Sequence, residues 1–222
     1  MLADYQNKEY KEVLRQKGII EIPYENFSDE ALLSLASTFG KVVPGARGEV
    51  VQTLLAREKG KGPKGSFSYT VGYGQFPWHT DTAYWDVPTR YLLLTSDKPS
   101  PCATTYQSFD ALRNAIKDFD YLMARSVYLV NVHGNRRYLS PSFKKAGKNG
   151  YRLDFHIFRP MNDEAKILMQ LVGYELEKSY FRYLWTGKSV AVIDNWRIIH
   201  GRESASEDRN RILKRVYIDE LV

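Results

Sequence analysis

The stretch VAVIDNWRIIHGRESASEDRNRILKRVYI, residues 190–218, contains the pattern that decides the fold. Two apolar, β-branched runs meet at the polar pair Asp194 and Asn195, and a third run follows a polar segment. Such runs, separated by turn-forming residues, predict short β-strands. The second strand carries His200, one of only four histidines in the chain.

Similar runs fill the middle of the sequence, and helical patterns flank or interrupt them. The predicted strands are residues 19–23, 49–56, 66–72, 89–96, 103–109, 125–132, 151–158, 189–196 and 212–218. The predicted helices are residues 4–18, 28–40 with Ser28 as N-cap, 109–119, and one that starts near Asn162 and packs Ile167, Leu168, Leu171 and Val172 into the core. Short strands with helices outside predict a mainly β fold, a barrel or jelly roll whose mouth holds a small ligand.

Length and composition predict one domain over residues 1–222. No stretch approaches the roughly 20 apolar residues of a membrane span, and the first residues lack the apolar core of a signal peptide. We therefore expect a soluble, cytoplasmic protein with no membrane partner. Because Cys102 is the only cysteine, an intrachain disulfide and a cysteine-rich zinc site are excluded, and any metal must be held by His, Asp or Glu.

The formal net charge of +6 and an aromatic content of 14% suit an anionic small molecule or, less directly, nucleic acid. The basic residues are scattered rather than gathered into a stripe, so we expect no nucleic-acid partner. The densest basic stretch, residues 57–66, is glycine-rich and reads first as a solvated loop and second as a lid. Residues 140–150 are a second candidate for closing over a substrate.

GQFPWHTDTAYWD, residues 74–86, places His79 and Asp81 two positions apart. On a strand these side chains share a face and could grip one metal ion, although a histidine beside a carboxylate is more often a hydrogen-bonded pair. A third ligand should come from a distant strand. His133 and His156 read as structural histidines, whereas His200 closes a strand and is the better candidate.

Two imidazoles and one carboxylate on one face of an octahedral ion form the ligand set of non-heme iron(II) oxygenases. His79, Asp81 and His200 would supply it. Eleven residues after His200 comes Arg211, and Arg215 follows four residues later. A bidentate guanidinium suits the far carboxylate of a 2-oxo acid that chelates the iron.

These pieces resemble the taurine dioxygenase (TauD/TfdA) family of iron(II)- and 2-oxoglutarate-dependent oxygenases. The matching segments are WHTD, DNWRIIHGR, the Arg-x3-Arg pair after the distal histidine, and ATTYQSFDAL. The resemblance implies a double-stranded β-helix, or cupin-like jelly roll. It also implies that Arg211, assisted by Thr104, takes 2-oxoglutarate, and that Arg215 and Gln75 face the substrate. Gln75 reads equally well as a turn residue.

The implied enzyme is a dioxygenase that uses Fe(II), 2-oxoglutarate and O2. It releases succinate and CO2 and hydroxylates an aliphatic carbon of a small polar metabolite, anionic or zwitterionic and amino-acid-like. Related halogenases carry a small residue at the carboxylate position, so Asp81 favours hydroxylation, or desaturation or cyclisation, over halogenation. The alternatives are a cupin-like metal enzyme that does not use 2-oxoglutarate and a nucleic-acid binding module. A homo-oligomer is compatible with the sequence.

Overall fold

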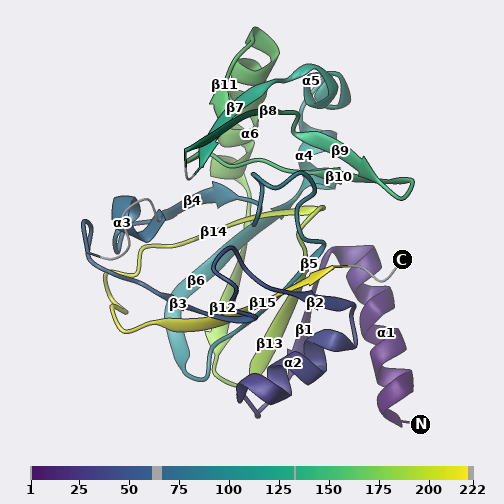
Figure 1. Cartoon of the computed structure of the whole chain (residues 1–222), viewed down its shortest axis with the longest axis vertical. Coiled ribbons are helices and arrows are strands. Elements are labelled where there is room, and N and C mark those ends of the chain that lie inside the picture. The colour runs from purple at the N-terminus through teal and green to yellow at the C-terminus, as the bar shows by residue number, and fades with distance from the viewer. Residues whose placement is uncertain (1, 62–66, 133, 220–222) are drawn as a thin grey trace.

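Two antiparallel sheets form the centre of the molecule (Figure 1). We describe the fold from a computed structural model that covers residues 2–61, 67–132 and 134–219. The larger sheet has the order β1-β13-β5-β15-β2, and β3 also pairs with β15. Its strands are β1 (Ile19–Pro23), β2 (Lys41–Val43), β3 (Val51–Leu55), β5 (Tyr91–Thr95), β13 (Ser189–Asp194) and β15 (Ile212–Asp219).

The smaller sheet has the order β12-β6-β14-β4 and carries both histidines of the predicted metal site. Its strands are β4 (Phe76–His79), β6 (Pro99–Ser108), β12 (Phe181–Thr186) and β14 (Ile198–Arg202). Leu92, Ile193, Trp185 and Leu213 belong to one buried cluster that joins the two sheets. The mainly β, jelly-roll fold predicted from the strand pattern is therefore confirmed.

Two helices cover the outer face of the larger sheet, at the lower right of Figure 1. They are α1 (Leu2–Lys17) and α2 (Asp29–Ser37). Ser28 caps α2 as predicted, because its side chain accepts a hydrogen bond from the backbone N–H of Ala31. Both faces of β5 are therefore buried, with Leu93 against the helices and Leu92 between the sheets, which explains its continuous apolar run.

A second group of elements, above the sheets in Figure 1, covers the end where β4 and β14 lie. It contains α4 (Phe109–Ala115), α5 (Phe119–Arg125), α6 (Asp163–Lys178), β7 (Tyr128–Val132), β8 (Asn135–Leu139) and β11 (Arg159–Pro160), with the hairpin β9 (Ser142–Lys145) and β10 (Lys148–Tyr151) beside them. Leu112, Met123, Val130 and Leu168 share its buried core. No helix in the described ranges is both long and apolar enough to cross a membrane.

Four local predictions are wrong. The predicted strand at 66–72 is the short helix α3 (Phe67–Val71), and 151–158 is mostly a turn in which Asp154 forms an isolated bridge to His79. The predicted helix at 109–119 ends at Ala115, because Ile116 is extended, and a second helix begins at Phe119 after Asp118, whose φ is 59°. In α6, Leu168 is fully buried as predicted but Ile167 is exposed.

Candidate active site

His79 and His200 lie directly opposite each other on the neighbouring strands β4 and β14. Their ring centroids are 4.4 Å apart. The Asp81 carboxylate completes the group, with Oδ1 3.8 Å from His79 Nε2 and Oδ2 3.8 Å from His200 Nε2. One ligand atom from each residue lies within 4.8 Å of the others, and all three residues are buried. The three predicted metal ligands are thus brought together.

Asp81 reaches this position from a turn, whereas the sequence predicted it on the same strand as His79. Strand β4 ends at His79, so Asp81 lies in the following turn and not on the strand face. The Asn195 side chain fixes that turn: its Oδ1 accepts from the backbone N–H of Asp81 at 2.8 Å, and its Nδ2 donates to the Asp81 carbonyl at 2.9 Å. Because Asn195 is fully buried and also donates to the Thr89 carbonyl, it clamps the segment that carries the ligand.

The ring of His79 is oriented by its own strand. Its Nδ1 lies 2.9 Å from the Pro77 carbonyl oxygen. Because that oxygen can only accept a hydrogen bond, the contact requires the tautomer that carries the hydrogen on Nδ1. That tautomer leaves the Nε2 lone pair facing Asp81 and His200, as a metal ligand requires. Two imidazole nitrogens and one carboxylate on one side of a site are the donor set of non-heme iron(II). The residues present therefore fit an iron ion.

Burial and neighbouring charge set the protonation of this cluster. Burial, with a smaller contribution from His79 beside it, lowers the pKa of His200 to about 3, so the ring is neutral at pH 7. Burial alone would raise the pKa of Asp81, but Arg215 and the two histidines outweigh burial and hold it below its ordinary value. A neutral imidazole and an ionised carboxylate are the forms that bind a metal.

Arg211 is buried beside Thr104. Its Nη2 donates to Thr104 Oγ1 at 3.3 Å, and Trp185 Nε1 donates to the same oxygen at 3.2 Å. Among the described residues, Arg211 Nε has no hydrogen-bond partner and no carboxylate lies within ion-pair distance of the guanidinium. Burial lowers the pKa of Arg211 to about 10, which still leaves it charged at pH 7. A buried, uncompensated guanidinium suits an anionic ligand.

Arg215 lies on β15, which begins at Ile212 directly after Arg211. Arg215 Nη1 donates to Asp81 Oδ1 at 2.7 Å, and its Nη2 donates to Gln52 Oε1 at 2.6 Å. The anion that this buried arginine requires is therefore Asp81, one of the three predicted metal ligands. Gln75 is exposed just before β4.

The remaining sequence candidates are His133, His156 and the segments 57–66 and 140–150, some of which fall outside the described residues. His156 is exposed in the turn after Asp154, and His133 lies outside the described residues. Of the loop at 57–66, the described part ends at residue 61, so its role as a lid stays a prediction. Residues 140–150 contain the hairpin β9–β10 rather than an irregular loop.

Sequence reasoning missed Asn195, Gln52 and Trp185. Asn195 was visible only as a turn residue, and the other two occupy ordinary positions in predicted or unassigned strands. A polar pair at the end of an apolar strand is the one signal that could have drawn attention to Asn195.

The family model described as "Taurine catabolism dioxygenase TauD, TfdA family" matches residues 2–128. This is more than half of the chain. The chain belongs to the TauD/TfdA family. It is therefore an iron(II)- and 2-oxoglutarate-dependent dioxygenase by family, as the motifs predicted. No curated protein gives a significant match.

Solved structures of three oxygenases or related proteins share the fold of this TauD/TfdA-family chain. Asparagine oxygenase, in complex with Fe(II), hydroxyasparagine and succinate, has a TM-score of 0.77 at 13% identity and covers 97% of this chain and 79% of its own. The non-heme iron oxygenase OrfP, with Fe and α-ketoglutaric acid, has a TM-score of 0.76 at 17% identity, covering 98% and 79%. PvcB from Pseudomonas aeruginosa has a TM-score of 0.69 at 19% identity, covering 96% and 79%.

Proposed function

We propose that this dioxygenase hydroxylates an aliphatic carbon of a small amino-acid-like metabolite. In this proposal His79, Asp81 and His200 hold Fe(II), and Arg211 with Thr104 holds 2-oxoglutarate. The observation that carries the proposal is the buried guanidinium of Arg211, which among the described residues has no carboxylate at ion-pair distance and lies in a fold that also buries a His/His/Asp cluster.

When bound, the iron and 2-oxoglutarate would supply oxidation by O2: one oxygen atom enters succinate as 2-oxoglutarate loses CO2, and the other enters a C–H bond of the substrate. The residues of the chain supply position. Arg211 would pair with the far carboxylate of 2-oxoglutarate. Thr104 orients Arg211 through the 3.3 Å hydrogen bond, and Trp185 fixes Thr104 in turn. Asp81 occupies the third ligand position, which favours hydroxylation over halogenation.

Arg215 and Gln75 stay our candidates for contacts with the substrate. An amino-acid-like substrate is supported by what two proteins of the same fold hold: asparagine oxygenase is complexed with hydroxyasparagine and OrfP with (3S)-hydroxy-L-Arg. The net charge of +6 also suits a substrate that carries an acidic group.

The test is succinate release from 2-oxoglutarate by the purified protein with Fe(II) and O2, measured alone and with each standard L-amino acid. We expect a low uncoupled rate that one amino acid or a small group raises, with a product that gains one oxygen atom by mass. Asp81→Ala is the matched inactive control. Metal-dependent turnover of a substrate with no consumption of 2-oxoglutarate would instead indicate the cupin-like alternative.

A further inference from the structure

A pocket of about 420 Å³ lies between the segment that follows Asp81 and the β7–β8 hairpin. Its volume falls within the range of about 300–1,000 Å³ that small-ligand sites occupy. Tyr84 and Trp85 line one side and Val130 and Val132 of β7 line the other. These apolar and aromatic walls suit the aliphatic part of a small metabolite.

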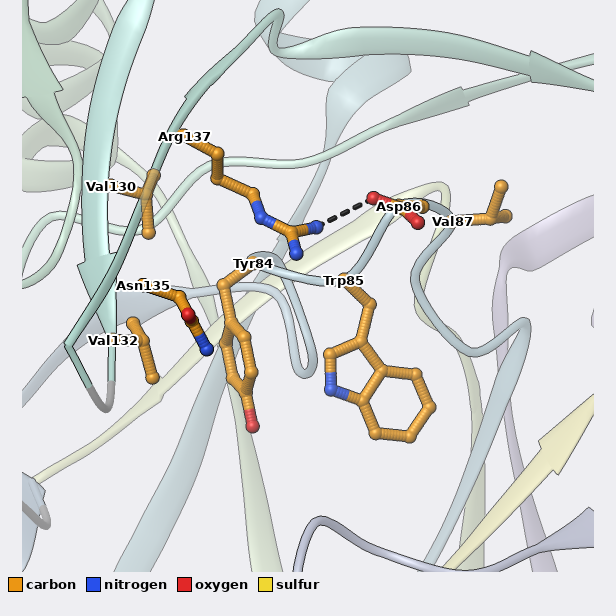
Figure 2. Close-up of a pocket in the computed structure, with 8 residues that line it drawn as sticks. All are labelled: Tyr84, Trp85, Asp86, Val87, Val130, Val132, Asn135 and Arg137. Atoms are coloured by element: carbon orange, nitrogen blue, oxygen red, sulfur yellow. Dashed lines mark hydrogen bonds and ion pairs between the residues drawn. The ribbon is translucent and has the colours of Figure 1, made fainter.

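A pair of opposite charges lies on the same pocket. Arg137 of β8 and Asp86 form an ion pair of 2.5 Å between Nη1 and Oδ1. Figure 2 shows the Arg137 side chain reaching toward Asp86, while the rings of Tyr84 and Trp85 point away from that pair. The side chains are 41% and 93% exposed, so the pair is accessible to solvent and contributes at most about 1 kcal/mol to stability. A ligand can therefore separate the two charges at low cost.

Contacts between side chains link the wall of the pocket to the cluster of His79, Asp81 and His200. Arg215, which is bonded to Asp81, lies over the Tyr217 ring with its guanidinium carbon 4.6 Å from the centroid. Tyr217 in turn contacts Trp85, with ring centroids 6.1 Å apart. Tyr84 interacts electrostatically with Arg215. The wall of the pocket is thus in contact with the residue that touches a metal ligand.

The wall is also held rigidly. The buried Arg152 guanidinium donates to the backbone carbonyls of Trp85, at 2.6 Å, and of Asp86, at 3.3 Å. Asn195 fixes the start of the same segment at Asp81. Because both ends of residues 81–86 are anchored, Asp86 has a defined position relative to the cluster.

We propose that Asp86 and Arg137 bind the charged headgroup of the substrate, Asp86 taking an ammonium group and Arg137 taking a carboxylate. The ligand class is a free α-amino acid, and its side chain lies along Tyr84 and Trp85 toward the metal ligands. This inference rests on the proposed function and names the substrate class of that same site. Opposite charges on one pocket are complementary to a zwitterion, whereas a simple dianion would be repelled by Asp86.

Arg215 is the competing site for the substrate carboxylate. Its two terminal nitrogens already donate to Asp81 and Gln52, so a carboxylate there must displace a partner from a buried position. The partner of Arg137 is an exposed carboxylate that solvates readily once released. The rim pair is therefore the less costly headgroup site.

The experiment uses the full-length protein with Fe(II) and 2-oxoglutarate. Each standard L-amino acid is tested for stimulation of succinate release, and the best is compared with its α-amide and its decarboxylated amine. We expect Arg137→Gln to raise the KM for the amino acid about 10- to 100-fold, to leave the KM for 2-oxoglutarate unchanged, and to remove the preference over the α-amide. Asp86→Asn should raise the KM for the amino acid similarly and remove the preference over the N-acetyl derivative. Arg136→Gln removes the same charge from the neighbouring position of β8 and should leave all KM values unchanged.

A charge swap separates recognition from a merely structural latch. Asp86→Arg combined with Arg137→Asp keeps an ion pair of the same strength, so a latch would recover its wild-type KM while a headgroup site would not. Recovery by the swap overturns the proposal, as does an unchanged KM in Arg137→Gln, or loss of the preference over the amide only in Arg215→Gln. If the wild type releases succinate from 2-oxoglutarate but no amino acid stimulates it, the headgroup assignment is wrong, whereas the assignment of 2-oxoglutarate as cosubstrate stands. If it never consumes 2-oxoglutarate, the proposed function itself fails.

Discussion

Replacing Arg211 by Gln should separate cosubstrate binding from metal binding. Arg211 is 7% exposed, and among the described residues its guanidinium has only Thr104 as a side-chain hydrogen-bond partner, so a carboxylate placed beside it would form a largely desolvated charge pair. Removing one member of such a pair costs about 2–5 kcal/mol. At about 1.4 kcal/mol per tenfold change, the apparent affinity for 2-oxoglutarate should fall by a factor of about 30 to a few thousand.

Two assays measure this effect. The first is the KM for 2-oxoglutarate in succinate release, and the second is quenching of tryptophan fluorescence as 2-oxoglutarate is added. Trp185 is a built-in reporter because its indole N–H is bonded to Thr104, the residue that touches Arg211. Trp185→Phe identifies its share of the signal.

The affinity of the Arg211→Gln protein for Fe(II) should equal that of the wild type, since Arg211 is not among the three clustered ligand residues. Arg209→Gln is the matched control, because Arg209 is exposed and packs on the Tyr73 ring instead. An unchanged 2-oxoglutarate dependence in Arg211→Gln would refute the assignment and transfer it to Arg209 or Arg215.

Three further predictions concern the metal ligands and the residue that clamps them. Changing His79 or His200 to Ala should abolish Fe(II) binding in equilibrium dialysis and also succinate release, because a single imidazole would remain to hold the ion. Asp81→Ala keeps both imidazoles, so it should weaken Fe(II) binding and abolish hydroxylation. Asn195→Ala should weaken Fe(II) binding about 10- to 100-fold, because Asn195 holds the backbone of Asp81. The KM for 2-oxoglutarate, measured at saturating iron, should change little. An Fe(II) affinity equal to that of the wild type would mean that these hydrogen bonds to Asp81 are not needed. Burial lowers the pKa of His200 from 6.5 to about 3, so between these values the unfolded chain takes up a proton that the metal-free fold does not. The free energy of unfolding should therefore fall as the pH drops from 6.5 toward 4, by up to about 3 kcal/mol, and urea titrations of His200→Gln should lack this part of the pH dependence.

Much of the candidate site could be predicted because the residues that would carry its chemistry lie in short sequence motifs. His79 and Asp81 are two positions apart, and Arg211 follows His200 at a fixed distance. The residue types alone restricted the metal to one held by imidazole and carboxylate. Local patterns also identified the N-cap at Ser28, where a side chain satisfies a backbone N–H three residues ahead.

Local patterns failed where tertiary contacts overrode propensity. The β-branched and aromatic residues of 66–72 favour a strand, yet Phe67–Val71 form a helical turn before β4. Residues 151–158 alternate like a strand, but Asp154 accepts hydrogen bonds from the backbone N–H groups of His156 and Ile157 and closes a turn. A side chain that bonds to nearby backbone competes with the sheet ladder, and periodicity does not detect it.

The sequence by itself determined the residue types of the site, their order along the chain and the β-rich character of the fold. Only the tertiary structure decided which side chains contact each other: His79 lies opposite His200, Asn195 holds Asp81 across 114 positions, and Arg215 bonds to Asp81. The physical reason is the sequence separation of the contacts involved. Hydrophobic periodicity and capping arise from contacts a few residues apart, whereas strand order and register are set by burial of whole sheets against each other, which brings distant positions together.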